Sequence, residues 1–165
     1  MSLQFSSPAT LASTSFSSLA SKNTTATAAA SCAARTTTTT NNIVDTQVVV
    51  KVVTPAFTAT TSTSVDIYVV GSIDGTNWPG ALATAEVIAG TDAAVTLSAN
   101  SNNLIWLGTL MCHTSGGTFT SEPLSIAPRF GGVMPKCWAV VIQNNLPAGV
   151  SLTSGTVTYT EVFYN

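Results

Sequence analysis

The stretch IVDTQVVVKVV, residues 43–53, decides the fold class of the chain. Val48, Val50 and Val52 fall on one face of an extended backbone, and Lys51 falls on the other. This period of two is typical of a half-buried β-strand. Valine also favours strands, because its branched side chain packs well on a pleated surface. The stretch therefore predicts a strand with a valine-lined inner face.

The same alternation recurs along the rest of the chain. Further strands are expected at residues 64–71, 84–90, 93–99, 103–110, 136–144 and 155–165. The stretches NLIWLGTL (103–110) and KCWAVVIQN (136–144) are almost continuously apolar, which predicts strands covered on both faces. The intervening segments are rich in Gly, Pro and Asn, as loops are. Short strands at this spacing predict an all-β fold, an antiparallel β-sandwich or jelly roll.

The chain carries very little charge. Charged residues make up 7% of its 165 residues, against about 25% in an ordinary soluble domain. The net charge of −2 comes without a basic patch, so no nucleic-acid partner is expected. No run of about 20 apolar residues occurs, so no membrane-spanning helix is expected. Because so neutral a surface has little electrostatic repulsion, it tends to associate, and the composition predicts a protein that works among partners.

Residues 1–42 differ from the rest of the chain. They consist mainly of Ser, Thr and Ala and contain no acidic residue. Isolated large apolar side chains are spaced along them and are expected to act as assembly anchors: Phe5, Leu11, Phe16 and Leu19. The composition predicts an extended arm that docks on the body or on a neighbouring subunit. The body is expected to be a β-sandwich over residues 43–165.

The stretch VVGSIDGTNWPG, residues 69–80, looks most like a motif. Asp74-Gly75 is a strong turn signal, because glycine accepts a positive φ and aspartate hydrogen-bonds the nearby backbone. An aspartic-protease reading fails, since that chemistry needs two adjacent carboxylates and the order Asp-Thr/Ser-Gly. The stretch predicts a hairpin turn made by Asp74, Gly75 and Trp78, with the indole folded back over the hairpin.

The stretch VDIYVVGSIDGTNWPG, residues 65–80, resembles a strand-Gly-Ser-x-Asp-Gly-x-x-Trp hairpin of tailed-bacteriophage virion structural proteins. A low-charge sandwich behind an extended arm is similar to phage head decoration (cement) proteins. This resemblance implies a non-enzymatic protein of the virion, on the capsid surface, that stabilises the phage head. It implies the major capsid protein or other virion proteins as partners, and a homo-oligomer, with a trimer favoured.

The same loop is also similar to the Ser-x-Asp-Gly-x-x-Trp signature of discoidin-like carbohydrate-binding sandwiches. Those domains carry more charge, and an Arg-bearing loop that would complete their sugar site is missing here. The alternative to a decoration protein is therefore a tail or neck appendage or a carbohydrate-binding adhesin module. An exposed Trp78 would favour the adhesin.

Other reactive residues do not assemble into a site in the sequence. The chain has three cysteines, Cys32, Cys112 and Cys137, and none is in C-x-x-C spacing. They are expected to be buried thiols, and a disulfide between Cys112 and Cys137 is the alternative. His113 is the only histidine, and no second pair of metal-ligand residues accompanies it and Cys112 in the sequence. It is therefore expected in a loop and not at a metal site. We predict no catalytic residue, metal or cofactor.

The three tryptophans could in principle form a sugar platform. Trp106 and Trp138 lie inside apolar strands, where packing in the core is the stronger expectation. Only Trp78 is placed in a loop by this interpretation.

Overall fold

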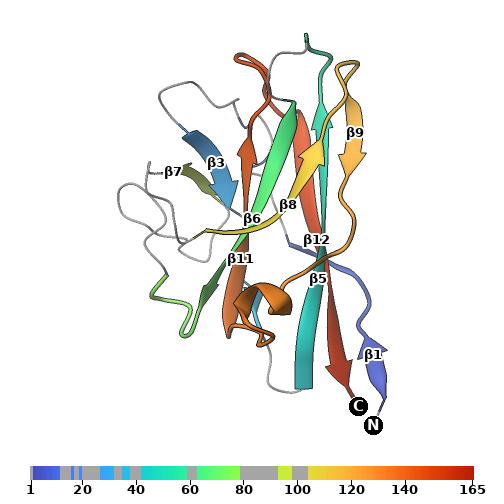
Figure 1. Cartoon of the computed structure of the whole chain (residues 1–165), viewed down its shortest axis with the longest axis vertical. Helices are drawn as coiled ribbons and strands as arrows, with labels where there is room; N and C mark the ends of the chain where they lie inside the picture. The colour runs from blue at the N-terminus through green and yellow to red at the C-terminus, as the bar shows by residue number, and fades with distance from the viewer. Residues whose placement is uncertain are drawn as a thin grey trace.

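The computed structural model is an antiparallel β-sandwich, as the strand pattern predicts (Figure 1). The structure describes residues 2–11, 16, 19, 27–31, 35–37, 42–58, 63–78, 93–97 and 104–165. Within these residues the regular structure is β, apart from one 3₁₀ turn, η1 (Ala127–Phe130). No helix of the described chain is both long enough and apolar enough to cross a bilayer.

The first sheet, called sheet one, is built around the long strand pair β5–β12. Its six strands are β1 (Leu3–Phe5), β2 (Ala9–Leu11), β5 (Asn42–Thr54), β9 (Gly117–Thr120), β10 (Leu124–Ser125) and β12 (Ser154–Tyr164). Their order is β1-β12-β5-β10, with β2 also paired to β12 and β9 also paired to β5. Val157 lies opposite Val50 in the β5–β12 register, which places two inward-facing valines side by side.

The second sheet, called sheet two, has β11 at its centre. Its strands are β3 (Thr27–Ser31), β4 (Arg35–Thr36), β6 (Ser64–Ser72), β7 (Ala93–Leu97), β8 (Ile105–Met111) and β11 (Cys137–Asn144). Their order is β7-β3-β11-β6-β8, with β4 also paired to β11. Strand β8 therefore ends this path on one side, and β6 lies between β8 and β11.

The core lies between the two sheets and follows the predicted alternation. In β5 the inward side chains Val48, Val50 and Val52 are fully buried. In β6 the inward residues Val65 and Ile67 are fully buried as well. Every residue of β11 is buried, which confirms that this strand is covered on both faces. Burial of this apolar area is the main contribution to the stability of the sandwich.

The described parts of residues 1–42 form strands of both sheets, so this segment docks on the body of its own chain. Strands β1 and β2 pair with β12, and β3 and β4 pair with β11. The side chains of Leu11, Phe16 and Leu19 belong to the main core cluster. Arg35 of β4 also reaches the other sheet, with its Nη2 3.1 Å from Glu161 Oε1.

Strand β8 departs from the expectation that Trp106 lies in the core. The indole is 51% exposed. The β6–β8 register shifts between Ile67 and Tyr68, so that Leu107 is taken into the core while Trp106 lies opposite Tyr68 on the outer face. A β-bulge re-aims side chains in this way. The expected strand at residues 84–90 lies outside the described residues.

Candidate functional site

The predicted turn after β6 is confirmed, and its hydrogen bonds close within the loop. Asp74 Oδ1 accepts the backbone N–H groups of Thr76 and Asn77, both at 2.8 Å. Asp74 Oδ2 accepts Asn77 Nδ2 at 2.7 Å, and Gly75 has a φ of +81°. The backbone N–H of Asn77 is the largest cause that lowers the pKa of Asp74 far below its ordinary value. The carboxylate is thus engaged in holding the loop.

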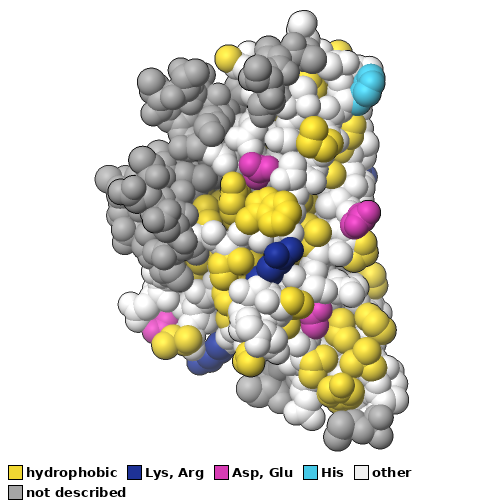
Figure 2. Space-filling model, viewed as in Figure 1, with side chains coloured by type: hydrophobic (Ala, Val, Ile, Leu, Met, Phe, Trp, Pro, Cys, Tyr) yellow, Lys and Arg dark blue, Asp and Glu magenta, His cyan; other side chains and the backbone are white. Residues whose placement is uncertain are grey.

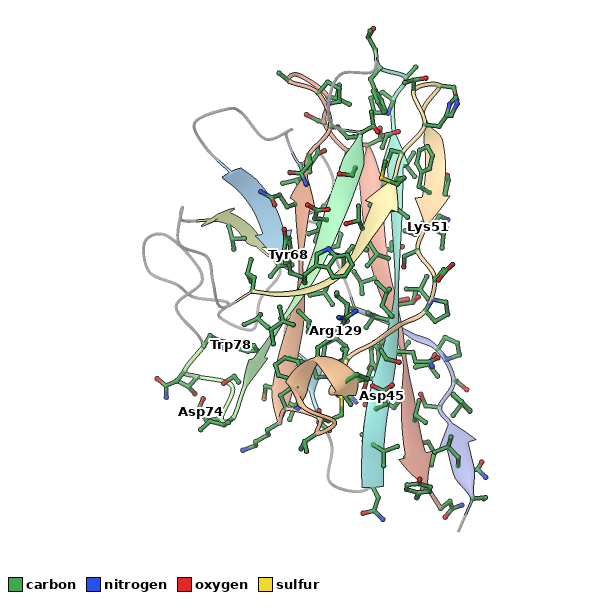
Figure 3. All side chains as sticks on the ribbon, in the orientation of Figure 1. Asp45, Lys51, Tyr68, Asp74, Trp78 and Arg129 are labelled. Atoms are coloured by element: carbon green, nitrogen blue, oxygen red, sulfur yellow. The ribbon has the colours of Figure 1, made fainter. Side chains whose placement is uncertain are left out.

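Among the described strands, none that follows the turn directly pairs with β6 as a hairpin partner would. Strand β6 pairs with β11 and β8, whereas β7, the next described strand, pairs with β3. Trp78 Nε1 donates to Gly75 O at 3.1 Å, and the half-buried indole packs against the outer-face cluster of sheet two. Asp74, Gly75 and Trp78 therefore form one self-satisfied structural loop, labelled in part in Figure 3.

The expected assembly anchors fall into two groups. Leu11, Phe16 and Leu19 are buried in the core of their own chain, so they are not free to bind a neighbour. Phe5 is 59% exposed on β1. The two groups differ because the chain turns toward the core after β1. There β2 pairs with β12, and Leu11 lies opposite Val157.

An apolar patch surrounds Phe5 at the end of the sandwich where the two termini lie together (Figure 1). Leu3 of β1 is 50% exposed and Tyr164 of β12 is 42% exposed. Leu3 and Tyr164 are register partners, so these side chains form one continuous group, the β1/β12 patch. Figure 2 shows hydrophobic side chains gathered at this end of the molecule.

A second surface, the Trp106 surface, lies on the outer face of sheet two and combines aromatic and polar side chains. Across β8 and β6, Trp106 lies opposite Tyr68, and Thr109 lies opposite Asp66. The two pairs form neighbouring rows, one aromatic and one polar, because residues two apart on β6 share a face. Figure 2 shows an uncovered hydrophobic group in the middle of this face, flanked by Lys/Arg and by Asp/Glu side chains.

Hydrogen bonds hold the polar row of the Trp106 surface. Trp106 Nε1 donates to Thr109 Oγ1 at 3.2 Å, and Thr109 Oγ1 donates to Asp66 Oδ1 at 2.8 Å. Asn145 Nδ2 donates to Asp66 Oδ2 at 2.6 Å. Partial burial, and then the charge of Asp66, raise the pKa of Tyr68 above its ordinary value. The Tyr68 hydroxyl donates to Gln143 Oε1 at 3.3 Å.

Arg129 of η1, labelled in Figure 3, lies against the indole of Trp106. Its guanidinium carbon lies 5.5 Å from the centroid of the Trp106 ring. Its Nη2 donates to the backbone oxygen of Leu107 at 3.2 Å. Beside the ring is an open cleft of about 430 Å³ between β8 and the chain around β9 and β10. Polar groups on its wall include Thr109, Ser121 and Glu122.

Sequence reasoning missed the Trp106 surface. The available signal was Gly108, because an isolated glycine inside a strand pattern often marks a bulge. A bulge there places Trp106 and Thr109 on the same face although they are three residues apart. The contribution of Asp66 and Asn145 depends on strand pairing between distant segments, for which the sequence has no local signal.

Among the described residues, the other reactive side chains do not form a site, and Cys32 lies outside the described residues. Cys112 and Cys137 are buried free thiols, and burial raises the pKa of the Cys112 thiol to about 11. His113 is an exposed loop residue whose Nδ1 lies 2.8 Å from Ser115 Oγ. Among the described residues, no group of three or more His, Cys, Asp or Glu side chains is arranged to hold a metal ion.

The fold and these surfaces define an all-β sandwich with two candidate binding surfaces, the β1/β12 patch and the Trp106 surface. No model of a known protein family matches the sequence. No curated protein matches it significantly either. The resemblance to phage decoration proteins therefore stays a prediction.

Proposed function

We propose that this protein is a non-enzymatic structural component of a tailed-phage virion, a decoration protein that binds the outside of the head. The observation that carries the proposal is the β1/β12 patch, an exposed apolar surface at the edge of sheet one. The resemblance of residues 65–80 to virion proteins supplies the class of partner, the major capsid protein or another virion protein.

The edge position of β1 suits an assembly role. Strand β1 pairs with β12 on one side and ends the path of sheet one on the other. An edge strand offers backbone N–H and C=O groups to a strand of another chain. Leu3 and Phe5 add apolar area at the same place. Because they are 50% and 59% exposed, burying the rest of each contributes roughly half of the ~1.5–3 kcal/mol of a fully exposed side chain. With a net charge of only −2, the chain brings little repulsion to such a contact.

Binding to phage heads that lack outer proteins tests this proposal. We expect co-sedimentation of the purified chain with the heads, and a clearly lower occupancy for a Leu3→Ala/Phe5→Ala variant. Ile73→Ala is the matched control, because Ile73 is 84% exposed but lies in the loop after β6. If the chain does not bind heads, or if the double variant binds as the unchanged protein does, the decoration role is wrong.

The oligomeric state is a separate part of the proposal. We infer a homotrimer from the resemblance. Sedimentation equilibrium of the isolated chain should give a trimer. If the chain is a monomer at every concentration, the trimer is wrong, whereas attachment to the head is unaffected by that result.

A tail or neck appendage is the alternative location, and the β1/β12 patch would serve it equally well. Electron microscopy of particles carrying the labelled protein separates the two, since label on the tail or neck contradicts the head assignment. The adhesin alternative no longer rests on Trp78, because that indole is half-buried and its Nε1 is bonded to Gly75 O.

A further inference from the structure

We propose that the Trp106 surface is a binding subsite for an uncharged pyranose ring, either a free sugar or one residue of a surface glycan. This goes beyond a purely structural role in a particle and does not depend on it. The inference starts from the two neighbouring rows on sheet two, Trp106–Tyr68 and Thr109–Asp66.

The aromatic row suits the apolar side of a sugar. A pyranose presents C–H groups on its ring faces and hydroxyls around its rim, and ligand sites for such molecules combine aromatic walls with a few placed polar groups. Trp106 is 51% exposed on an otherwise ordered strand. Exposure of so large an apolar ring has a cost in water, which a stacked ligand would remove.

The ring is also held in place before any ligand arrives. Its Nε1 is bonded to Thr109 Oγ1, and Arg129 lies against it while bonded to the backbone of Leu107. A side chain fixed in this way loses little conformational entropy on binding, so more of the contact energy appears as affinity.

The polar row provides acceptors at the edge of the ring. Asp66 Oδ1 accepts a hydrogen bond from Thr109 and Oδ2 accepts one from Asn145, and the Tyr68 hydroxyl also interacts with this carboxylate. A carboxylate has about four acceptor positions, so capacity remains for ligand hydroxyls. Neighbouring hydroxyls of a sugar are spaced to donate to both oxygens of one carboxylate.

The charges around the site favour a neutral ligand. The guanidinium of Arg129 lies against the indole, and the carboxylate of Asp66 is linked to it through Thr109, so neither a sugar acid nor an amino sugar cation is favoured. The adjacent cleft of about 430 Å³ has the exposed carboxylate of Glu122 on its wall. It gives room for the next residue of an oligosaccharide beside the stacked one.

The test uses the whole chain with defined probes. Methyl pyranosides of glucose, galactose, mannose and N-acetylglucosamine are titrated by saturation-transfer NMR, and an array of immobilised neutral glycans is probed in parallel. We expect binding to at least one probe, with the array alone positive if the ligand is a polymer-bound glycan. Trp106→Ala should weaken that binding about tenfold or more, as loss of a central aromatic contact does. Met111→Ala, an exposed change on the same strand, should leave it unchanged.

Two further variants keep the test decisive. Trp106→Phe retains a ring and should bind more weakly than the unchanged protein but better than Trp106→Ala, so it serves if the alanine variant does not fold. Asp66→Asn should weaken binding because it removes the charged acceptor. No binding to any probe, binding unaffected by all three changes, or binding of a proline-rich peptide at Trp106 in place of sugars would overturn the proposal. Head attachment is measured separately, so failure of the one is distinguishable from failure of the other.

Discussion

The side chain of Phe16 packs directly on the backbone of Gly155 in β12. A Cβ built on Gly155 would lie 2.8 Å from Phe16 Cβ, closer than two side chains can approach. Phe16 is fully buried, although it comes from a Ser/Thr/Ala-rich segment with no strand pattern. The glycine thus provides the space that admits the N-terminal segment into the core.

Phe16→Ala should lower the free energy of unfolding by about 3–5 kcal/mol, the usual cost of removing a buried phenylalanine. Gly155→Ala should also destabilise, because the added methyl group displaces Phe16. Phe5→Ala is the control and should change stability by less than about 0.5 kcal/mol, since Phe5 is exposed. Urea unfolding followed by circular dichroism measures all three. Equal stability of the Phe16 and Phe5 variants would contradict the packing.

Deletion of residues 1–41 should unfold the sandwich or strongly destabilise it. The deletion removes β1 to β4, which pair with β12 or β11, together with the core side chains Leu11, Phe16 and Leu19. The same deletion would be harmless if the segment were a separate arm. Thermal melting by circular dichroism distinguishes a segment built into the sandwich from a separate arm. An unchanged melting temperature would show that the segment is a separate arm.

Asp74 should make the stability of the folded protein depend on pH in the acid range. Its pKa is lowered on folding, so its hydrogen bonds stabilise the folded state above the ordinary aspartate pKa of about 3.9. That contribution is lost as pH falls below this value toward the lowered pKa. The urea midpoint of the unchanged protein should therefore exceed that of Asp74→Asn at pH 6, and the gap should narrow between about pH 4 and pH 2.

Glu122→Gln is the control for this experiment, because it removes an exposed carboxylate outside the loop. A gap between the Asp74→Asn variant and the unchanged protein that does not vary with pH would mean that the charge of Asp74 is not what holds the turn.

The thiols of Cys112 and Cys137 should be inert in the folded protein. Both are buried, and burial raises the pKa of the Cys112 thiol to about 11, so little thiolate forms at pH 8. In a Cys32→Ser background, Ellman's reagent should react slowly with the folded chain and with two thiols per chain in denaturant. Fast reaction before unfolding would contradict the burial, and fewer than two reactive thiols in denaturant would indicate a disulfide.

The strands with a strong alternating pattern were predictable from sequence. In β5 and β6 the inward residues, such as Val50 and Ile67, are those that the period of two places on one face. Asp74-Gly75 was predictable as a turn, because its hydrogen bonds join residues within three positions of each other. Local patterns of this kind depend on backbone geometry, which each short segment carries in itself.

The N-terminal strands and the Trp106 surface were not predictable. Thr, Ser and Ala side chains leave almost no periodic signal, so nothing in residues 27–31 indicates that they pair with β11. Trp106 lies in an apolar stretch, and only the register shift against β6 turns it outward. Its hydrogen-bonding partner Thr109 is nearby in sequence, but Asp66 is not.

The sequence by itself determined the all-β class, the inner faces of the long strands, the loop at Asp74 and the low charge of the surface. Those properties follow from spacing and composition, which act over a few residues. Only the tertiary structure decided that Phe16 fills the core against Gly155, and that Asp66, Thr109 and Trp106 share one face. Such contacts join segments far apart in the chain, and which segments meet is set by the packing and hydrogen bonding of the whole sandwich.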